Sequence, residues 1–203
     1  MIKYNLSPPN DPSFNYAAGL LPQRNLPQNW YQDSSCRSNL ADFKLSSENK
    51  RIIKLTSEYT FKRLPLSQYQ LSAATLNQIT GWVDSLGWDF PKSSIKTIFT
   101  RHLFNQLYLW NEMGDSQIIA YAICYFGKDL SHIGYVFYQP ELGKTNLPIR
   151  LLLQCTIDSY QLNLKYCYLG RFDPKTKLGY YKRNAPGFEY YQYENPPSWH
   201  RWH

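Results

Sequence analysis

The sequence contains no long apolar run and no hydrophobic leader. None of its apolar stretches reaches the roughly 18–20 residues that a membrane-spanning helix requires. The first residues, Met1 to Pro9, lack the hydrophobic region of a signal peptide. Both absences favour a cytoplasmic protein that does not span a membrane.

Cysteine and histidine are scarce, and neither shows the spacing of a metal site. No two cysteines form a Cys-x-x-Cys pair, and no histidine is spaced with a cysteine as structural zinc requires. The sequence therefore predicts buried free thiols and no bound metal. The residues concerned are Cys36, Cys124, Cys155, Cys167, His102, His132, His200 and His203.

Aromatic residues and positive charge are abundant instead. Aromatics make up 17% of the 203 residues, and 18 of them are tyrosines, which bury a ring and keep a polar tip. Lys and Arg number 22 against 15 Asp and Glu, which gives a net charge of +7. This balance favours an anionic partner such as RNA, a nucleotide or a membrane surface over a merely soluble basic protein.

One α/β domain after an irregular N-terminal arm accounts for the pattern of the chain. Residues 1–33 are rich in Pro, Asn, Gln and aromatics with little periodicity, so we expect an arm there and a single domain over 34–203. Helical spacing predicts three helices, which begin at Ser46 or Ser47, span 67–87 and span 147–162. Apolar and aromatic runs predict strands at 59–65, 103–110, 117–126, 131–138 and 166–171.

The order strand, helix, strand between residues 131 and 171 is the most informative part of the chain. The aromatic run Tyr135-Val136-Phe137-Tyr138 ends at Pro140, and a helical segment and a second strand follow. Such a unit implies a parallel strand pair. Because ligands bind beyond the carboxyl ends of such strands, we expect the functional site there.

Two basic clusters are candidate contacts to nucleic acid. Lys50, Arg51 and Lys54 share a predicted helix and can contact phosphates; the alternative is a solvated helix face. The second cluster adds aromatic faces on which unpaired bases can stack; its alternative is a charged loop with packed tyrosines. It comprises Arg171, Phe172, Lys175, Lys177, Tyr180, Tyr181, Lys182 and Arg183.

Candidate catalytic residues lie at the end of the third predicted strand of the central run. Glu141 can accept the proton of an amine or hold its ammonium group, and Tyr138 can line the same cleft. The segment 143–146 precedes a predicted helix, so its N–H groups can hold an anion, and Lys144 within it is a further nucleic-acid candidate. The alternatives are a turn carboxylate and a core tyrosine.

Several short segments occur with a characteristic order and spacing over residues 19 to 191. They are Cys36-Arg37, 46–54, 104–108, 117–124, 135–142, 162–170 and 177–182. Together they resemble the C-terminal domain of the arginyl- and leucyl-tRNA–protein transferases, which belongs to the GNAT superfamily.

The resemblance implies a GNAT-like fold, α/β (α+β), as a single domain with a mixed central sheet flanked by helices. It also implies an aminoacyltransferase that moves an amino acid from charged tRNA to an amine, such as a protein N-terminus. Aminoacyl-tRNA is then a co-substrate, and no bound cofactor is expected. Because Cys36 stands alone where the arginyl enzymes have a cysteine cluster, we expect no iron–sulfur cluster either.

Departures from the family motifs leave the substrates open. Tyr138-Gln139-Pro140-Glu141 replaces the family's Tyr-Asp-Pro-Asp/Glu, so one carboxylate is lost. The acceptor can be a protein, a peptide or a smaller amine. Two further hypotheses are an acyl-CoA-dependent GNAT N-acyltransferase with acetyl-CoA at residues 143–146, and a non-catalytic RNA-binding protein on the same scaffold.

Overall fold

A large mixed β-sheet forms the centre of the protein. The computed structural model describes residues 3–4, 11–26, 28–101 and 103–202. Within them the sheet has eight strands, which in spatial order are β11 (Ser198–Arg201), β10 (Phe188–Gln192), β4 (Ser35–Asn39), β9 (Tyr166–Arg171), β8 (Leu130–Tyr138), β7 (Ala120–Phe126), β6 (Gln106–Glu112) and β5 (Tyr59–Pro65).

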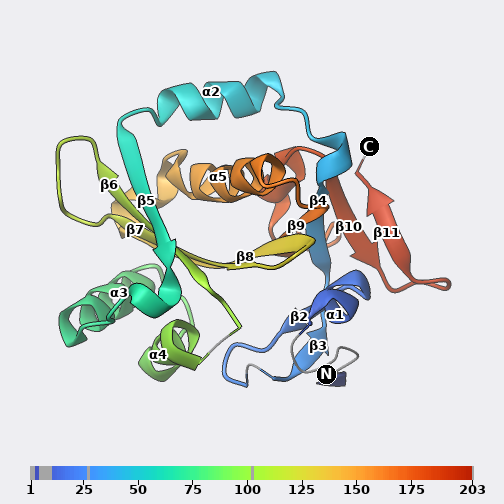
Figure 1. Cartoon of the computed structure of the whole chain (residues 1–203), viewed down its shortest axis with the longest axis horizontal. Helices are drawn as coiled ribbons and strands as arrows, with labels where there is room; N and C mark the ends of the chain where they lie inside the picture. The colour runs from blue at the N-terminus through green and yellow to red at the C-terminus, as the bar shows by residue number, and fades with distance from the viewer. Residues whose placement is uncertain (1–2, 5–10, 27, 102, 203) are drawn as a thin grey trace.

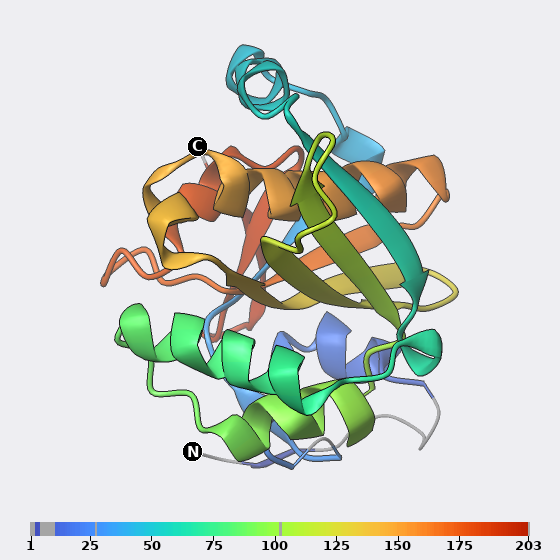
Figure 2. The ribbon, with the colours of Figure 1, turned by 90° about the vertical axis from the view of Figure 1, so that its left-hand side faces the viewer.

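Helices cover both faces of this sheet (Figures 1 and 2). Helix α5 (Leu147–Gln161) lies on one face, and α2 (Ser47–Leu55) lies outside α5. Helices α3 (Ala73–Ser85) and α4 (Lys92–Arg101) lie on the opposite face. The arrangement confirms the predicted α/β class with a mixed central sheet flanked by helices.

The predicted strand–helix–strand unit is β8, α5 and β9, and its two strands are parallel. The other strand pairs of the sheet are antiparallel. The parallel ladder is short, because its last pair is His132 with Tyr168. Both strands continue past that pair, β8 to Tyr138 and β9 to Arg171. The strands therefore separate toward their carboxyl ends and leave a gap.

A bulge in β8 lies at the start of this gap. The register between β7 and β8 shifts, because Cys124 pairs with Ile133 and Ile123 pairs with Tyr135. Gly134 is the extra residue, and a Cβ there would lie 2.1 Å from Cζ of Phe104. A bulge bends its strand, and here the bend requires a glycine because an aromatic ring occupies the space of a side chain.

The helix boundaries follow from local capping. Ser46 caps α2, and its hydroxyl accepts from Asn49 N while the Asn49 side chain accepts from Ser46 N, which is a complete capping box. The Ser72 hydroxyl caps α3 by accepting from Thr75 N. Helix α4, which the sequence pattern did not predict, buries Ile95, Ile98 and Phe99. Short 3₁₀ turns complete the chain: η1 (Leu40–Asp42), η2 (Leu66–Gln68), η3 (Pro140–Lys144) and η4 (Tyr180–Asn184).

The N-terminal stretch is more regular than the predicted irregular arm. Its described part holds a short helix, α1 (Ser13–Ala17), and a small antiparallel sheet of β1 (Lys3–Tyr4), β3 (Trp30–Gln32) and β2 (Leu20–Pro22). Tyr16 of α1 is fully buried against the large sheet, with its ring centroid 4.7 Å from that of Tyr168. The division into 1–33 and 34–203 stays a prediction.

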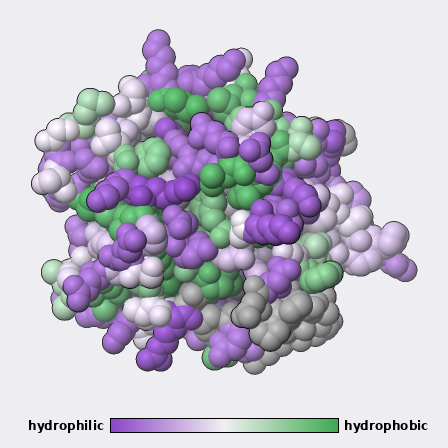
Figure 3. All heavy atoms as spheres, in the orientation of Figure 1, coloured by the Kyte–Doolittle hydropathy of each residue, from purple (hydrophilic) through white to green (hydrophobic). Residues whose placement is uncertain are grey.

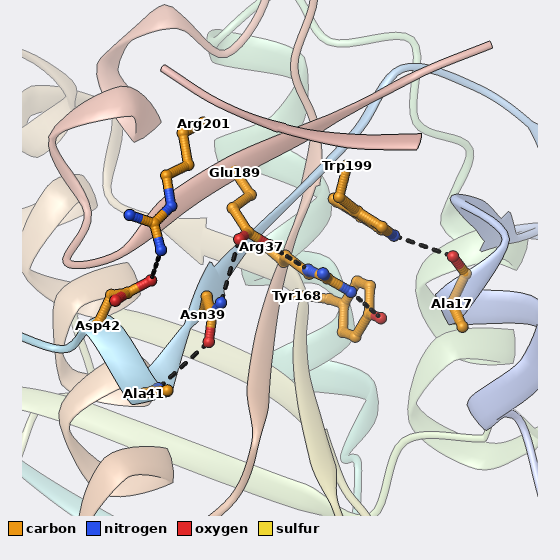
Figure 4. A network of polar contacts seen from close by, with 9 residues as sticks. All are labelled: Ala17, Arg37, Asn39, Ala41, Asp42, Tyr168, Glu189, Trp199 and Arg201. Atoms are coloured by element: carbon orange, nitrogen blue, oxygen red, sulfur yellow. Dashed lines mark hydrogen bonds and ion pairs between the residues drawn. The ribbon is translucent and has the colours of Figure 1, made fainter. Parts of the chain in front are cut away.

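The C-terminal stretch adds two strands that the sequence pattern did not predict. β10 pairs with β4, and β11 pairs with β10. A buried polar network fixes this edge of the sheet (Figure 4). Nε of Arg37 donates to the Glu189 carboxylate at 2.8 Å, and the Arg37 guanidinium lies over the Trp199 ring at 3.9 Å. Trp199 in turn donates to the carbonyl of Ala17 at 2.9 Å, so the network also holds α1.

The cysteines lie among the apolar side chains that pack on both faces of the sheet. All four cysteines are buried free thiols, as predicted. Within the described residues, no three His, Cys, Asp or Glu side chains are placed to hold a metal ion. No helix in that part of the chain combines the length and apolar character needed to cross a membrane.

Candidate functional site

A cavity of about 230 Å³ occupies the gap between β8 and β9. On the α5 face it is lined by Pro148 and Leu152. On the opposite face it is lined by Leu21, Pro22 and Tyr31 of the N-terminal sheet. Because residues from both faces line one space, the cavity passes through the sheet. It can do so because the ladder between β8 and β9 ends at His132 and Tyr168.

Two cationic residues, Arg171 and Lys182, line the cavity. Arg171 ends β9, and Lys182 of η4 donates from Nζ to the Arg171 carbonyl at 2.9 Å. The turn that returns η4 over β9 requires Gly179, which has φ of +67° and whose Cβ would lie 2.4 Å from the Arg171 carbonyl oxygen. Lys182, Arg171 and the neighbouring Tyr181 all line the cavity.

His132 lies where the parallel ladder ends and also lines the cavity. Its ring is buried, and its Nδ1 is 2.7 Å from the Tyr16 hydroxyl. Burial raises the pKa of Tyr16 well above its usual value, so this hydroxyl stays protonated at neutral pH. A histidine in such a pair can hold or move a proton inside the cavity.

Tyr138 and Glu141, the predicted catalytic residues, lie at the carboxyl end of β8. Tyr138 is half-buried, with its ring centroid 5.7 Å from that of Trp88. Burial raises the pKa of Tyr138, and the charge of Tyr181 adds to the effect. Glu141 is exposed in η3, beyond the strand end. Their catalytic roles stay predictions.

The turn before α5 offers few N–H groups for an anion. Thr145 Oγ1 already accepts from Leu147 N at 3.1 Å, and Thr145 N donates to the Leu142 carbonyl at 3.0 Å. Pro148, within the first helical turn, has no N–H. Lys144 is exposed in this turn. A pyrophosphate therefore finds fewer donors here than in a glycine-rich turn.

The two predicted basic clusters are neighbours in space. Lys50, Arg51 and Lys54 are exposed on α2, and hydrophilic side chains project along that edge of the molecule (Figure 3). Nδ2 of Asn49 donates to the carbonyl of Asn184 at 3.0 Å, which ties α2 to η4 and its basic residues. One polyanion can thus contact both segments.

The members of the second cluster differ in their surroundings. Lys175 and Lys177 are exposed on the turn between β9 and η4. Tyr180 is half-buried against Phe172, and the Arg183 guanidinium lies over the Tyr180 ring at 3.9 Å. Phe172 is fully buried. Tyr181, Lys182 and Arg171 are the members that reach the cavity, whereas the others contact solvent or pack under η4.

Cys36 and Arg37, the pair named in the resemblance, lie in β4 and face the interior. Burial raises the pKa of the Cys36 thiol to about 12, so it is not a thiolate nucleophile at neutral pH. Arg37 is held by Glu189 and by aromatic rings (Figure 4). The pair therefore supports the sheet edge and contributes no reactive group.

Sequence reasoning missed part of the cavity wall. Tyr31 and His132 lie far apart in the sequence and meet only in three dimensions. Tyr135 was singled out as a strand residue and proves to line the cavity as well. No local pattern marks Tyr31, because it lies in a stretch without periodicity, and His132 was weighed only as a metal ligand.

The sequence matches no known family profile and no curated protein. Solved structures do match the fold. The C-terminal domain (DUF2156) of a protein assigned as a lysylphosphatidylglycerol synthetase from Agrobacterium fabrum has a TM-score of 0.54 at 14% identity, over 75% of this chain and 51% of that chain. A GCN5-related glucosamine N-acetyltransferase region of a fungal multi-domain GH3 β-N-acetylglucosaminidase has a TM-score of 0.50 at 12% identity, over 77% and 19%.

The chain has a GNAT fold. This confirms the fold that the sequence resemblance implied. The chain spans about half the length of the Agrobacterium structure, which it covers to 51%. A match to an arginyl- or leucyl-tRNA–protein transferase is not shown, so that part of the resemblance stays a prediction.

Proposed function

We propose that the protein is an acyltransferase that moves an aminoacyl group from charged tRNA to an amine acceptor. One observation carries the proposal: Arg171 and Lys182 line the cavity through the sheet, and exposed basic segments adjoin η4. An acyl ester can enter such a gap while cations outside it hold the phosphates of the carrier.

The structural neighbours support the same class of chemistry. The Agrobacterium domain comes from a protein assigned as a lysylphosphatidylglycerol synthetase. In the reaction proposed for this chain, the amino acid leaves the 3′ oxygen of tRNA and joins an acceptor. Electrophile and nucleophile both arrive on substrates, so the protein mainly positions them and stabilises the tetrahedral oxyanion.

The gap supplies groups suited to that oxyanion. Beyond His132, β8 continues without β9 as its ladder partner, so an acyl carbonyl in the gap would lie against the backbone of β8. Lys182 adds a positive charge at the rim. The amine must lose a proton, for which Glu141 at the end of β8 and His132 inside the cavity are candidate acceptors.

Charged tRNA with a labelled amino acid tests this function directly. The purified protein is incubated with pools of tRNA charged with single labelled amino acids and with a mixture of peptides and small amines. We expect one pool to lose label to an acceptor in an amide that resists mild base. If every pool keeps its label on tRNA, the transferase proposal is wrong, and salt-sensitive tRNA binding without transfer would favour the RNA-binding alternative.

An acyl-CoA-dependent N-acyltransferase is the second candidate, because the GNAT fold is shared with a glucosamine N-acetyltransferase region. Acetyl-CoA would then place its pyrophosphate at residues 143–146. Pro148 and the occupied N–H groups of Thr145 and Leu147 make that site poor in donors, which favours charged tRNA. If acetyl-CoA raises the melting temperature and acetate alone does not, acetyl-CoA rather than charged tRNA would be favoured as the acyl donor.

A further inference from the structure

A second groove, of about 540 Å³, lies against the cavity on the face covered by the N-terminal sheet. The two spaces share Tyr31, Tyr135 and Arg171 as lining residues. A ligand in the groove can therefore contact a ligand that occupies the cavity between β8 and β9. The groove lies on the side of the sheet away from α5, so a substrate can approach there while an acyl donor enters from the other face.

Asp33 provides the negative charge of this groove. Its side chain is 16% exposed, and Oδ2 accepts from Nε of Arg171 at 2.5 Å while Oδ1 accepts from Ser34 N at 2.7 Å. Burial raises the pKa of Asp33, although Arg171 opposes that effect. The result is a desolvated carboxylate held in one orientation beside the opening to the cavity.

Arg24 provides a separate positive charge in the same groove. Its guanidinium lies over the Phe90 ring at 4.3 Å, and Nη1 donates to the Asp89 carbonyl at 2.9 Å. These contacts fix the plane of the guanidinium and use one of its donors, whereas its other donors have no acceptor within the described part of the chain. A planar donor group of this kind suits a carboxylate or phosphate.

The two charged residues line the groove together with Tyr31. Burial raises the pKa of Tyr31, the Asp33 charge raises it further, and the charges of Arg171 and Arg24 lower it. All three charged groups, Asp33, Arg171 and Arg24, line the same groove as Tyr31. The groove therefore presents a carboxylate and a guanidinium to a single small ligand, with the apolar rings of Phe90 and Tyr135 on its wall.

We propose, on the basis of the transferase function proposed above, that this groove is the acceptor site and takes a small amine that carries an anionic group. Asp33 holds the amine at the opening to the cavity, and Arg24 binds the anionic group. The acceptor is thus an amino acid, a short peptide or a phosphate-bearing amine. A protein N-terminus does not carry an anionic group at a fixed short distance from its amine.

The transfer step balances without a further reactant. The neutral amine nitrogen forms a bond to the ester carbonyl carbon, and the bond from that carbon to the tRNA 3′ oxygen breaks. The nitrogen loses one proton to the base of the proposed transferase site, Glu141 or His132, and the departing 3′ oxygen gains one. Amine and ester become amide and alcohol.

Binding to the protein without tRNA tests the groove independently of the transfer activity. Titration calorimetry compares L-phenylalanine with phenethylamine, which lacks the carboxylate, and with 3-phenylpropionate, which lacks the amine. A second series compares O-phosphoethanolamine with ethanolamine and so separates a phosphate-bearing acceptor from an amino acid. We expect the parent compound of one series to bind at least about tenfold more tightly than its truncated analogues.

Variants assign each end of the ligand to a residue. Asp33→Asn is expected to abolish the preference for the amine, and Arg24→Gln the preference for the anionic group. Arg101→Gln, an exposed residue at the end of α4, is the control for loss of a surface charge. Because Asp33 is largely buried, the melting temperature of the Asp33→Asn variant is measured first. If that variant does not fold, Arg24→Gln alone still decides the test.

The outcomes separate this inference from the proposed function. If both parent compounds bind no better than their analogues, or if Arg24→Gln leaves the preference intact, the acceptor groove is wrong. If transfer from charged tRNA occurs and Glu141→Gln rather than Asp33→Asn lowers its rate, Asp33 is not the amine partner. Selective binding in the groove with no transfer from any charged tRNA would retain the groove and overturn the transferase.

Discussion

Arg37 is the side chain whose surroundings most constrain its chemistry. It is 7% exposed, its Nε pairs with Glu189, and its guanidinium lies between the rings of Tyr166 and Trp199. A buried ion pair of this kind adds little by itself, but removal of one partner leaves an uncompensated buried charge. Its role is to hold β4 against β10 and the chain end.

Replacement of Arg37 by Met is expected to lower the free energy of unfolding by about 3–5 kcal/mol, because Glu189 is left charged and buried. The matched control is Arg201→Met, which breaks the exposed pair with Asp42 and should cost at most about 1 kcal/mol. Urea unfolding followed by circular dichroism measures both. Equal losses for the two variants would contradict the structural role of Arg37.

Lys182 is the cation placed most directly at the cavity, and its removal is expected to lower the rate of transfer. Lys182→Met should reduce kcat/KM for charged tRNA by at least about tenfold, since a charge-assisted contact is worth about 1.5–3 kcal/mol. Lys182→Arg is expected to restore part of the loss. Lys96→Met, an exposed lysine on α4, is the control, and a loss as large in that variant would show a non-specific charge effect.

At the scale of elements, the bulge of β8 lies where β8 and β9 begin to separate. A Cβ at position 134 would overlap the Phe104 ring at 2.1 Å, so Gly134→Ala overpacks this point. We expect a loss of about 1–3 kcal/mol in the free energy of unfolding. The double variant Gly134→Ala with Phe104→Leu should recover much of the lost stability. If the losses of the two single variants simply add in the double variant, overlap with the Phe104 ring is not the cause of the destabilisation.

The start of α2 is set by its capping box rather than by propensity. Ser46→Ala removes the acceptor for Asn49 N and is expected to cost about 1 kcal/mol of stability. Ser47→Ala, one residue later and inside the helix, is the matched control and should be close to neutral. Thermal unfolding of the two variants measures the difference, and similar shifts would mean that the Ser46 hydroxyl does not act as the cap.

The sequence predicted the elements with long periodic or aromatic runs, and it did not predict those that are short or interrupted by proline and charge. β8, α5 and β9 were found because aromatic strands flank a long helical run, and β9 has the predicted bounds 166–171. α4 was missed because it is short and follows Gly87 and Pro91 closely, and β10 and β11 were missed because proline and charge interrupt the tail. The cavity wall could be predicted only in part, since Tyr31 and Tyr181 meet through the fold alone.

For the molecule as a whole, the adjacency of the basic segments makes a prediction about salt. The triple variant Lys50→Ala, Arg51→Ala, Lys54→Ala is expected to make the slope of log K against log salt for uncharged tRNA less steep by about 2–3, because each lost phosphate contact removes about 0.7–0.9. The control replaces Lys92, Lys96 and Arg101 of α4, which lies on the other face of the sheet (Figure 2). An unchanged slope in the α2 variant would exclude this helix from the tRNA surface.

The strand order has a consequence for the assembly of the protein during synthesis. β4 is made early, yet its two neighbours are β9 and β10, and Cys36 pairs with Tyr190 near the other end of the sequence. Such long-range pairing makes folding slow, because the intervening chain must be ordered first. Until the segment around 190 has left the ribosome, β4 exposes one edge, and the wall that closes the cavity is incomplete. Nascent chains of this protein are therefore expected to depend on chaperones until synthesis is almost finished.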